Sequence, residues 1–212
     1  LLDRVEWLTE LPKRFKGVVI ANEVLDAFPV KRISFIKDNF YELGVGFKEG
    51  KFDWERFNEP FMDSGIPSSM NFYQGYTTEI NLQANAWVKS LYDFLDDGVV
   101  FLIDYGMTES EYFHPQRSQG TLKCFSNHKS NDDPFINIGK QDITASINFS
   151  HIAQNAEDCG FEVSGYTTQS MFLISLGIEK YLKKEENEEK RVKIAREIKQ
   201  LVLPGTMGEV FK

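Results

Sequence analysis

Two short apolar runs predict a buried parallel sheet. Residues 17–21 form a continuous apolar run rich in β-branched side chains, and residues 98–103 form a second one. Runs without polar alternation are typical of central strands that are covered on both faces. The first run stops at Asn22 and Glu23, and the second stops at Asp104. The pattern therefore predicts an open α/β sheet whose ligand site lies beyond these strand ends.

The segment between the two runs has a different pattern, in which apolar and polar residues alternate. Between residues 41 and 54 every second position is apolar, with a break at Glu49-Gly50 that predicts a turn. This alternation is typical of a β-hairpin with one solvated face, and Ile33 and Phe35 predict a third strand. We expect residues 30–75 to form a small β-rich lobe inserted into an α/β domain made of residues 1–29 and 76–212.

Helical spacing follows the predicted lobe. Apolar residues recur at helical intervals over 78–96, with Thr77 or Thr78 as the expected cap and Gly98 as the expected end. A second helix is predicted over about 148–159, from Asn148 as cap to Gly160. The remaining predictions are a strand at 161–166, an apolar helix at 171–182, a charged helix at 184–202 and the beginning of a strand at 208–212.

Residues 107–142 show little periodicity although they leave directly from the second apolar run. Structureless connections of this length inside a compact domain are usually either functional or a sign that elements have been misassigned, and the departure of this segment from a buried strand favours function. The segment contains His114, Arg117 and His128. We expect it to form one wall of the ligand site.

Composition narrows the class of protein. The 212 residues suit one domain, or one domain with an inserted lobe, and 42% of them are apolar. There are 24 Lys and Arg against 32 Asp and Glu, a net charge of −8, which disfavours nucleic acid and favours a basic protein or peptide partner. Cys124 and Cys159 form no CxxC pair, so we expect reduced thiols. The longest apolar run is too short to span a bilayer. Because the sequence begins at Leu1, without Met or a signal-like segment, we expect it to be a fragment.

Polar residues at the two strand ends are the first candidates for chemistry. Glu23 and Asp26 form a pair of carboxylates that suits bidentate binding of a guanidinium, while Asn22 or Asp26 also suits the cap of a turn. Asp104, followed by Tyr105 and Gly106, ends the other strand and suits either a pocket or a turn.

Histidines give a second set of candidates. His114, His128 and His151, with Asp132 and Asp133, are residue types that bind metals, but their spacing matches no metal motif. His114 and His128 equally suit ordering of the long segment or contact with a substrate, and a metal hydrolase remains an alternative. The sequence has no GxSxG, HExxH or Walker motif, and its one Gly-x-Gly, at 44–46, lies in the predicted hairpin.

Several motifs, in order along nearly the whole chain, resemble those of the MidA-like methyltransferases, the family that includes a mitochondrial complex I assembly factor. They are Val19-Ile20-Ala21-Asn22-Glu23-Val24-Leu25-Asp26-Ala27-Phe28-Pro29-Val30, Gly75-Tyr76-Thr77-Thr78-Glu79-Ile80-Asn81, Leu102-Ile103-Asp104-Tyr105-Gly106, Glu111-Tyr112-Phe113-His114-Pro115 with Arg117, Gly120-Thr121-Leu122, His128, Asp133-Pro134, Gly139, Asp142-Ile143-Thr144, Gly165-Tyr166-Thr167-Thr168-Gln169 and Met207-Gly208-Glu209-Val210-Phe211-Lys212.

The resemblance implies a Rossmann-like class I methyltransferase fold, S-adenosylmethionine as cofactor, and transfer to an arginine side chain of a protein. We expect no metal site, because the spacing of the histidines matches no metal motif. The site residues that the resemblance implies are Asn22, Glu23 and Asp26 for catalysis, Asn22 and Glu23 for the cofactor, and Asp104, Tyr105, Gly106, His114, Arg117 and His128 for the substrate.

One departure from the family is clear. The glycine-rich turn after the first strand and the acidic residue after the second are absent, so we expect a C-terminal portion of the fold that is inactive by itself. The implied partner is an arginine-bearing subunit of a respiratory complex, in a bacterial cytoplasm or a mitochondrial matrix. A non-catalytic assembly factor is the alternative. An unpaired strand edge also predicts self-association as a homodimer.

Overall fold

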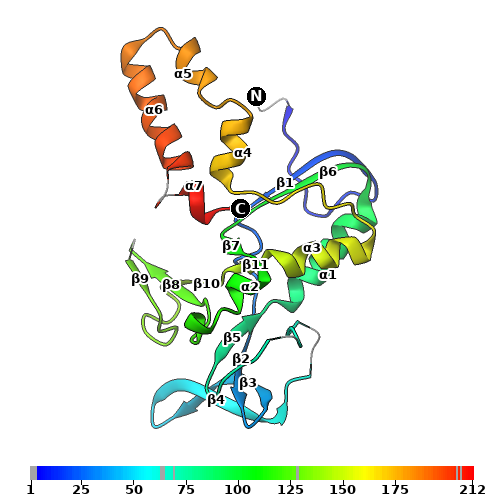
Figure 1. Ribbon diagram of the computed structural model, residues 1–212, viewed down its shortest axis with the longest axis vertical. Helices are drawn as coiled ribbons and strands as arrows, with labels where there is room; N and C mark the ends of the chain where they lie inside the picture. The colour runs from blue at the N-terminus through cyan, green and yellow to red at the C-terminus, as the bar shows by residue number, and fades with distance from the viewer. Residues whose placement is uncertain (1–3, 63–64, 69, 128, 204, 206) are drawn as a thin grey trace.

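Two parallel strands form the centre of the α/β part of the molecule. The computed structural model describes residues 4–212 apart from 63–64, 69, 128, 204 and 206. β1 (Phe15–Asn22) pairs with β6 (Leu95–Ile103) in parallel, and the register brings Asn22 opposite Ile103 (Figure 1). Both predicted strands and their parallel pairing are confirmed. Because the strands run in the same direction, their carboxyl ends meet at one edge.

Only one face of this sheet is covered over its whole length. α1 (Leu82–Phe94) and α3 (Phe149–Cys159) lie against that face and share a core with the segment after β1. On the other face Val18 is 55% exposed and Ile20 is 67% exposed. The prediction that both faces are buried is therefore wrong for the chain described here. The buried members of the shared core are Leu25, Ala84, Val88, Ile147, Phe149 and Ile152.

A pair of glycines lies opposite each other in the two central strands. Gly17 lies opposite Gly98 in the parallel register. A Cβ atom on residue 98 would lie 1.9 Å from the carbonyl oxygen of Gly17. Since no side chain fits such a gap, the glycine at 98 is a requirement of the strand pairing. The prediction that Gly98 ends the preceding helix is wrong, because α1 (Leu82–Phe94) ends before it.

The helix predicted over 78–96 is shorter at both ends. Asn81 is its N-cap and accepts a hydrogen bond from the amide of Ala84 at 3.0 Å, while the residue after the helix, Leu95, already begins β6. The expected caps, Thr77 and Thr78, instead lie in β5 (Thr77–Ile80), all of whose side chains are buried. The ladder that β5 forms with β2 (Lys31–Ile36) outweighs the local helical spacing.

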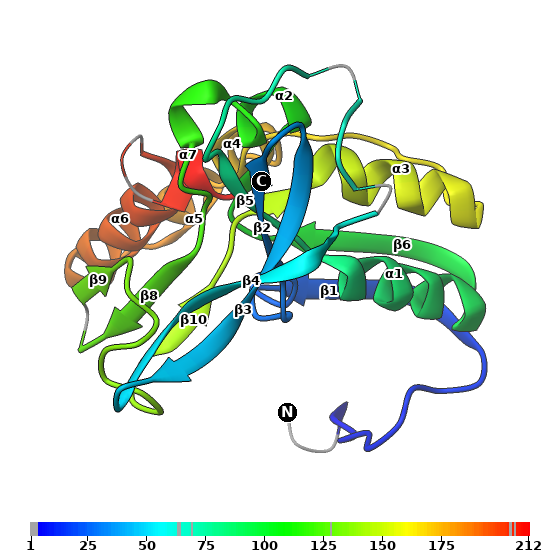
Figure 2. The same cartoon turned by 90° about the horizontal axis from the view of Figure 1, so that it is seen from below.

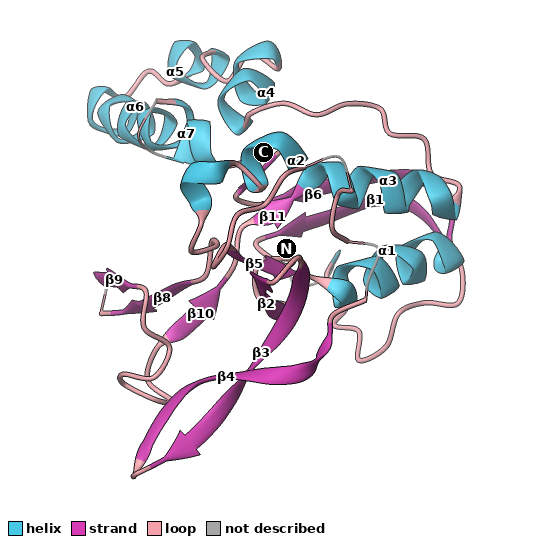
Figure 3. Ribbon diagram, turned by 60° about the horizontal axis from the view of Figure 1, so that its bottom comes forward, coloured by secondary structure: helices cyan, strands magenta, loops and turns pink. Residues whose placement is uncertain are grey.

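The lobe is a four-stranded antiparallel sheet in the order β4-β3-β2-β5. β3 (Asn39–Lys48) and β4 (Lys51–Pro60) form the predicted hairpin, which projects from the body of the molecule (Figure 3). Glu49 and Gly50 both have positive φ, at 51° and 78°, as the tight hairpin turn requires. The hairpin and the third strand are confirmed. The division of the chain at 30–75 stays a prediction, and β5 joins the lobe's sheet from beyond it.

The segment at 107–142 is not an irregular loop. β7 (Gly106–Met107), α2 (Glu109–Tyr112) and a 3₁₀ turn (Pro115–Arg117) precede a three-stranded sheet. The strands of that sheet are β8 (Lys123–Ser126), β9 (Lys129–Asn131) and β10 (Asp142–Thr144), beside which the lobe lies in Figure 2. β7 pairs with β11 (Ile147–Asn148). Elements of two to four residues are too short to leave a periodic signal, which explains why the sequence did not reveal them.

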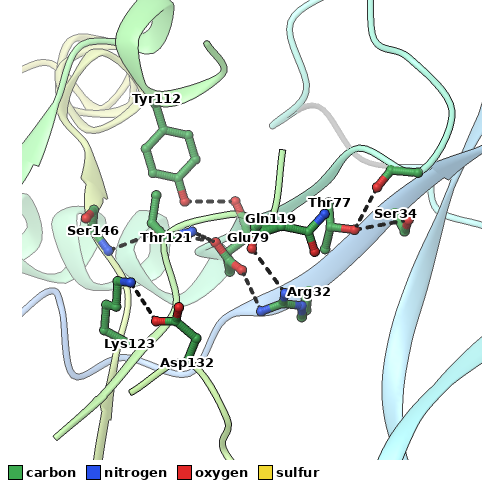
Figure 4. A network of polar contacts seen from close by, with 11 residues as sticks. Arg32, Ser34, Thr77, Glu79, Tyr112, Gln119, Thr121, Lys123, Asp132 and Ser146 are labelled. Carbon is green, nitrogen blue, oxygen red and sulfur yellow. Dashed lines mark hydrogen bonds and ion pairs between the residues drawn. The ribbon is translucent and has the colours of Figure 1, made fainter. Parts of the chain in front are cut away.

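A buried ion pair joins the lobe to this segment. Glu79 is 1% exposed, and its Oε1 lies 3.2 Å from Nη1 of Arg32. Its Oε2 accepts hydrogen bonds from the amide of Thr121 at 2.6 Å and from the Thr121 hydroxyl at 3.1 Å. Arg32 also donates to the carbonyl of Gln119 at 3.1 Å and lies 5.0 Å from the ring centroid of Trp54. Figure 4 shows Glu79 between Arg32 and Thr121, so its carboxylate links the lobe to the residues that precede β8.

The C-terminal helices differ in part from the prediction. The helix expected at 171–182 is divided at Gly177, which has φ of 77°, into α4 (Gln169–Ser175) and α5 (Lys180–Lys184). Residues 161–166 are irregular, so the strand predicted there is wrong. The charged helix is confirmed as α6 (Glu188–Val202), whereas α7 (Met207–Val210) replaces most of the last predicted strand. None of the helices in the described ranges is both long and apolar enough to cross a membrane.

The predicted helix at 148–159 is confirmed as α3. Asn148 caps it by accepting a hydrogen bond from the amide of His151 at 3.2 Å. Gly160 ends it with φ of 107°, a left-handed conformation in which glycine is favoured.

Candidate functional site

Two polar residues stand at the carboxyl end of β1, beside the tip of β6. Glu23 donates its backbone N–H to the carbonyl of Ile103 at 2.9 Å, so the pairing of the strands continues into the loop. The Nδ2 of Asn22 donates to Oε1 of Glu23 at 3.3 Å, and both side chains are exposed. Glu23 has φ of 51°, which is uncommon for a residue with a side chain and is often found at functional sites.

Asp104, at the end of β6, is turned inwards against this loop. It is 1% exposed, and its Oδ2 accepts the amide hydrogens of Leu25 at 3.0 Å and Asp26 at 3.2 Å. Its Oδ1 accepts from the amide of Tyr105 at 2.9 Å. Burial, and next the negative charge of Asp26, raise the pKa of Asp104 to about 6. Asp104 is therefore ionised near neutral pH and holds the loop after β1 through its backbone.

Asp26 is the second buried carboxylate of the loop. It is 7% exposed, and its Oδ2 accepts a short hydrogen bond from the hydroxyl of Tyr105. Burial and this hydrogen bond raise the pKa of Tyr105 above its usual range, so the tyrosine is the donor. The other oxygen, Oδ1, is buried and has no hydrogen-bond partner among the residues that the structure describes. A buried carboxylate oxygen without a partner is costly, which makes this atom a candidate acceptor for a ligand.

Asn81 is a residue of this site that the sequence analysis overlooked. Its Oδ1 caps α1, and its Nδ2 donates to the carbonyl of Leu25 at 3.2 Å. The carbonyl of Asp26 accepts from the amide of Ala145 at 3.4 Å. The loop is thus held from three directions. The only signal in the sequence was the place of Asn81 within a motif of the family.

The remaining candidates lie in different surroundings. Gly106 pairs with Ile147, and a Cβ atom there would lie 2.3 Å from the carbonyl oxygen of Ile147. His114 is exposed, and its Nδ1 accepts from the amide of Gln116 at 3.2 Å. Arg117 is also exposed and donates through Nε to the carbonyl of Glu111 at 2.9 Å. His128 lies outside the described residues.

The structure thus brings together one part of the predicted site. Five of the predicted residues meet at one edge of the sheet, namely Asn22, Glu23, Asp26, Asp104 and Tyr105. The histidine and arginine of the 3₁₀ turn make their hydrogen bonds within their own segment. Across the described ranges no group of three or more His, Cys, Asp or Glu residues is arranged to hold a metal ion.

Comparison with known sequences identifies the family. Residues 1–167 match the family described as "Putative S-adenosyl-L-methionine-dependent methyltransferase". The chain belongs to this family. The resemblance to MidA-like methyltransferases is therefore confirmed, and with it S-adenosylmethionine as the family's cofactor.

Individual relatives agree with this assignment. The chain is 25% identical to "Protein arginine methyltransferase NDUFAF7 homolog, mitochondrial" of Drosophila melanogaster over 220 residues, which cover 97% of this chain and 48% of the relative. A crystal structure from Burkholderia thailandensis, of a "likely methyl transferase" bound to S-adenosyl-homocysteine, is 37% identical with a TM-score of 0.92. It is matched over 100% of this chain and 56% of its own length.

A native crystal structure of an uncharacterized protein from the same bacterium is also 37% identical, with a TM-score of 0.91 over 99% of this chain and 57% of its own length. These matches confirm the methyltransferase fold. The chain spans about half the length of each of these relatives.

Proposed function

We propose that the chain is part of an S-adenosylmethionine-dependent methyltransferase that modifies an arginine side chain of a protein, with Asn22, Glu23 and Asp26 as catalytic residues. The observation that carries the proposal is the buried Oδ1 of Asp26, which has no hydrogen-bond partner among the described residues, in the same loop as the exposed Asn22 and Glu23. The name of the Drosophila relative supports arginine as the acceptor.

Asn22 and Glu23 suit one end of the cofactor. When bound, S-adenosylmethionine supplies a methyl group on a positively charged sulfur. The carboxylate of Glu23 complements that charge, and the amide of Asn22 offers both a donor and an acceptor. The hydrogen bond between the two side chains keeps both at the strand edge where ligands of α/β sheets bind.

The two carboxylates suit a guanidinium acceptor. A guanidinium presents its N–H groups in a planar fork, and Glu23 together with Oδ1 of Asp26 offers the acceptors for it. Carboxylates on one side draw the positive charge towards the nitrogens that they bind, which leaves the remaining nitrogen a better nucleophile. Tyr105 fixes Asp26 by its hydrogen bond and leaves only one oxygen for the substrate.

The other candidates have different parts in this proposal. Tyr105, His114 and Arg117 remain proposed substrate contacts, and His128, outside the described residues, belongs with them. Asp104 and Gly106 are assigned a different part, because Asp104 is 1% exposed and Gly106 has no side chain to offer. Both would shape the site without touching the acceptor.

The proposed partner is a basic, arginine-bearing protein, since the chain carries a net charge of −8. A respiratory-complex subunit and a role in complex I assembly are carried over as proposals from the family. A homodimer and a location in the bacterial cytoplasm or, in a eukaryote, the mitochondrial matrix are proposals of the same kind. The name of the Drosophila relative includes the word mitochondrial.

The test is Glu23→Gln in the protein as its gene encodes it, assayed for methyl transfer from labelled S-adenosylmethionine to arginine-bearing protein. Glu49→Gln is the matched control, because Glu49 has the same φ of 51° and is exposed on the hairpin turn. We expect a loss of about a hundredfold at Glu23 and no change at Glu49. Equal turnover of the two variants at saturating cofactor contradicts the proposal. Partner binding without any methyl transfer by the unsubstituted protein favours the assembly factor.

A further inference from the structure

The loop that carries the proposed catalytic residues is anchored by one side chain. We propose that Asp104 is a positioning residue whose carboxylate fixes the backbone at Leu25 and Asp26 and thereby sets the places of Asn22, Glu23 and Asp26. This inference rests on the proposed function for its consequence in the site, although the anchoring itself is independent of it.

The geometry of the anchor is specific. Two successive amides, those of Leu25 and Asp26, converge on a single oxygen of Asp104 at 3.0 and 3.2 Å. Hydrogen bonds to an ionised acceptor are stronger than those between neutral groups. On the other side of the turn, the amide of Glu23 is already held by the carbonyl of Ile103 at 2.9 Å. Between these two points the backbone has little freedom, so the left-handed conformation of Glu23 is held from both sides.

Asp104 is itself held firmly enough to serve as an anchor. Its backbone N–H donates to the carbonyl of Lys212 at 3.2 Å, and its carbonyl accepts from the amide of Lys212 at 2.9 Å. Its Oδ1 accepts from the amide of Tyr105, which fixes the plane of the carboxylate. A side chain fixed in this way cannot follow the loop when the loop moves. The anchor therefore preorganises the site and does not merely bury a charge.

A carboxylate, and not an amide, fits this position. The three amides that meet at residue 104 all donate, and they approach both oxygens of the side chain. In Asp104→Asn one of these oxygens becomes an NH₂ group. This group is a donor, so it cannot accept a hydrogen bond from the backbone N–H that it faces. The same substitution removes the repulsion between Asp104 and Asp26, so its effect on overall stability has no fixed sign. The position of the loop is the decisive readout.

The test compares Asp104→Asn with Asp53→Asn in the protein as its gene encodes it. Asp53 is the matched control, because its carboxylate also accepts a backbone amide, that of Trp54 at 2.7 Å, but it is exposed on the hairpin. We expect amide hydrogen exchange at Leu25 and Asp26 to accelerate by about tenfold or more in Asp104→Asn and to stay unchanged in Asp53→Asn. Affinity for S-adenosyl-homocysteine should fall in the first variant only.

The possible outcomes separate the two proposals. Unchanged amide hydrogen exchange at Leu25 and Asp26 in Asp104→Asn overturns the anchor. Faster exchange at both amides, with unchanged affinity for S-adenosyl-homocysteine and unchanged methyl transfer, overturns the role of the anchor in the site. An unsubstituted protein that neither binds S-adenosyl-homocysteine nor transfers methyl groups refutes the proposed function, while the exchange result still decides the anchor.

If Asp104→Asn does not fold, the unsubstituted protein carries the test through pH. The titratable groups that face Asp104 are Asp26 and Tyr105, and Lys212 pairs with its backbone. Opening of the loop exposes Asp104 to water and returns its pKa from about 6 towards 3.8, so protonation of Asp104 favours the closed loop. Protection factors at Leu25 and Asp26 should therefore rise as pH drops through about 6, relative to that of Phe35, whose amide is held in the lobe. Parallel behaviour of all three amides overturns the anchor.

Discussion

Replacement of Glu79 by Gln should be among the most destabilising single changes in the lobe. The side chain of Glu79 is fully buried and that of Arg32 is 13% exposed, so the substitution leaves a guanidinium with little water to compensate its charge. Removing one partner of a buried pair costs about 3–5 kcal/mol. Since Gln keeps one oxygen for the amide of Thr121, we expect about 3 kcal/mol, at the lower end of that range.

Urea unfolding of the protein measures this cost, with Glu55→Gln as the control. Glu55 also forms an ion pair, at 2.8 Å from Lys48, but its side chain is 49% exposed and that of Lys48 is 75% exposed. Such surface pairs contribute about 1 kcal/mol or less. Arg32→Met should be costly too, and the double variant of Arg32 and Glu79 should cost less than the sum of the two. An equal decrease in the free energy of unfolding for Glu79→Gln and Glu55→Gln would refute the reasoning.

Three further predictions concern the α/β part of the chain. Gly98→Ala should destabilise by about 2 kcal/mol or more in urea unfolding, because its Cβ would lie 1.9 Å from the carbonyl oxygen of Gly17, whereas Gly165→Ala, with open space around it, should have little effect. Asn148→Ala should lose the cap of α3 and about 1 kcal/mol, measured as a lower Tm. Because the pKa of Asp104 is raised from 3.8 to about 6, the native state binds more protons than the unfolded state over that interval. The contribution of Asp104 to stability should therefore fall by about 2 kcal/mol as pH rises from 4 to 6, and this slope should be absent from a pH series of unfolding curves of Asp104→Asn.

The sequence revealed those features that depend on neighbouring residues. The apolar runs identified β1 and β6, alternation identified the β3–β4 hairpin, and the residues flanking α3 identified its ends. β5 was misjudged because its place is decided by pairing with β2, about forty-five residues away in the chain. The exposed face of β1 was misjudged because an apolar strand looks the same in sequence whether or not anything covers it.

The candidate site shows the same division. Parallel strands were enough to predict that Asn22 and Glu23 stand beside the end of β6. The inward turn of Asp104 was not predictable, since its partners, Leu25 and Asp26, are 79 and 78 residues away. Nothing local distinguishes a carboxylate that faces a ligand from one that holds a backbone.

The central claim is that Asn22 and Glu23 face the site of methyl transfer, and a crystal structure of the protein with S-adenosyl-homocysteine tests it most directly. We predict that the sulfur atom lies at the carboxyl edge of β1, in contact with the side chain or backbone of Asn22 or Glu23. A sulfur atom bound elsewhere, with both residues left in solvent, would contradict the account.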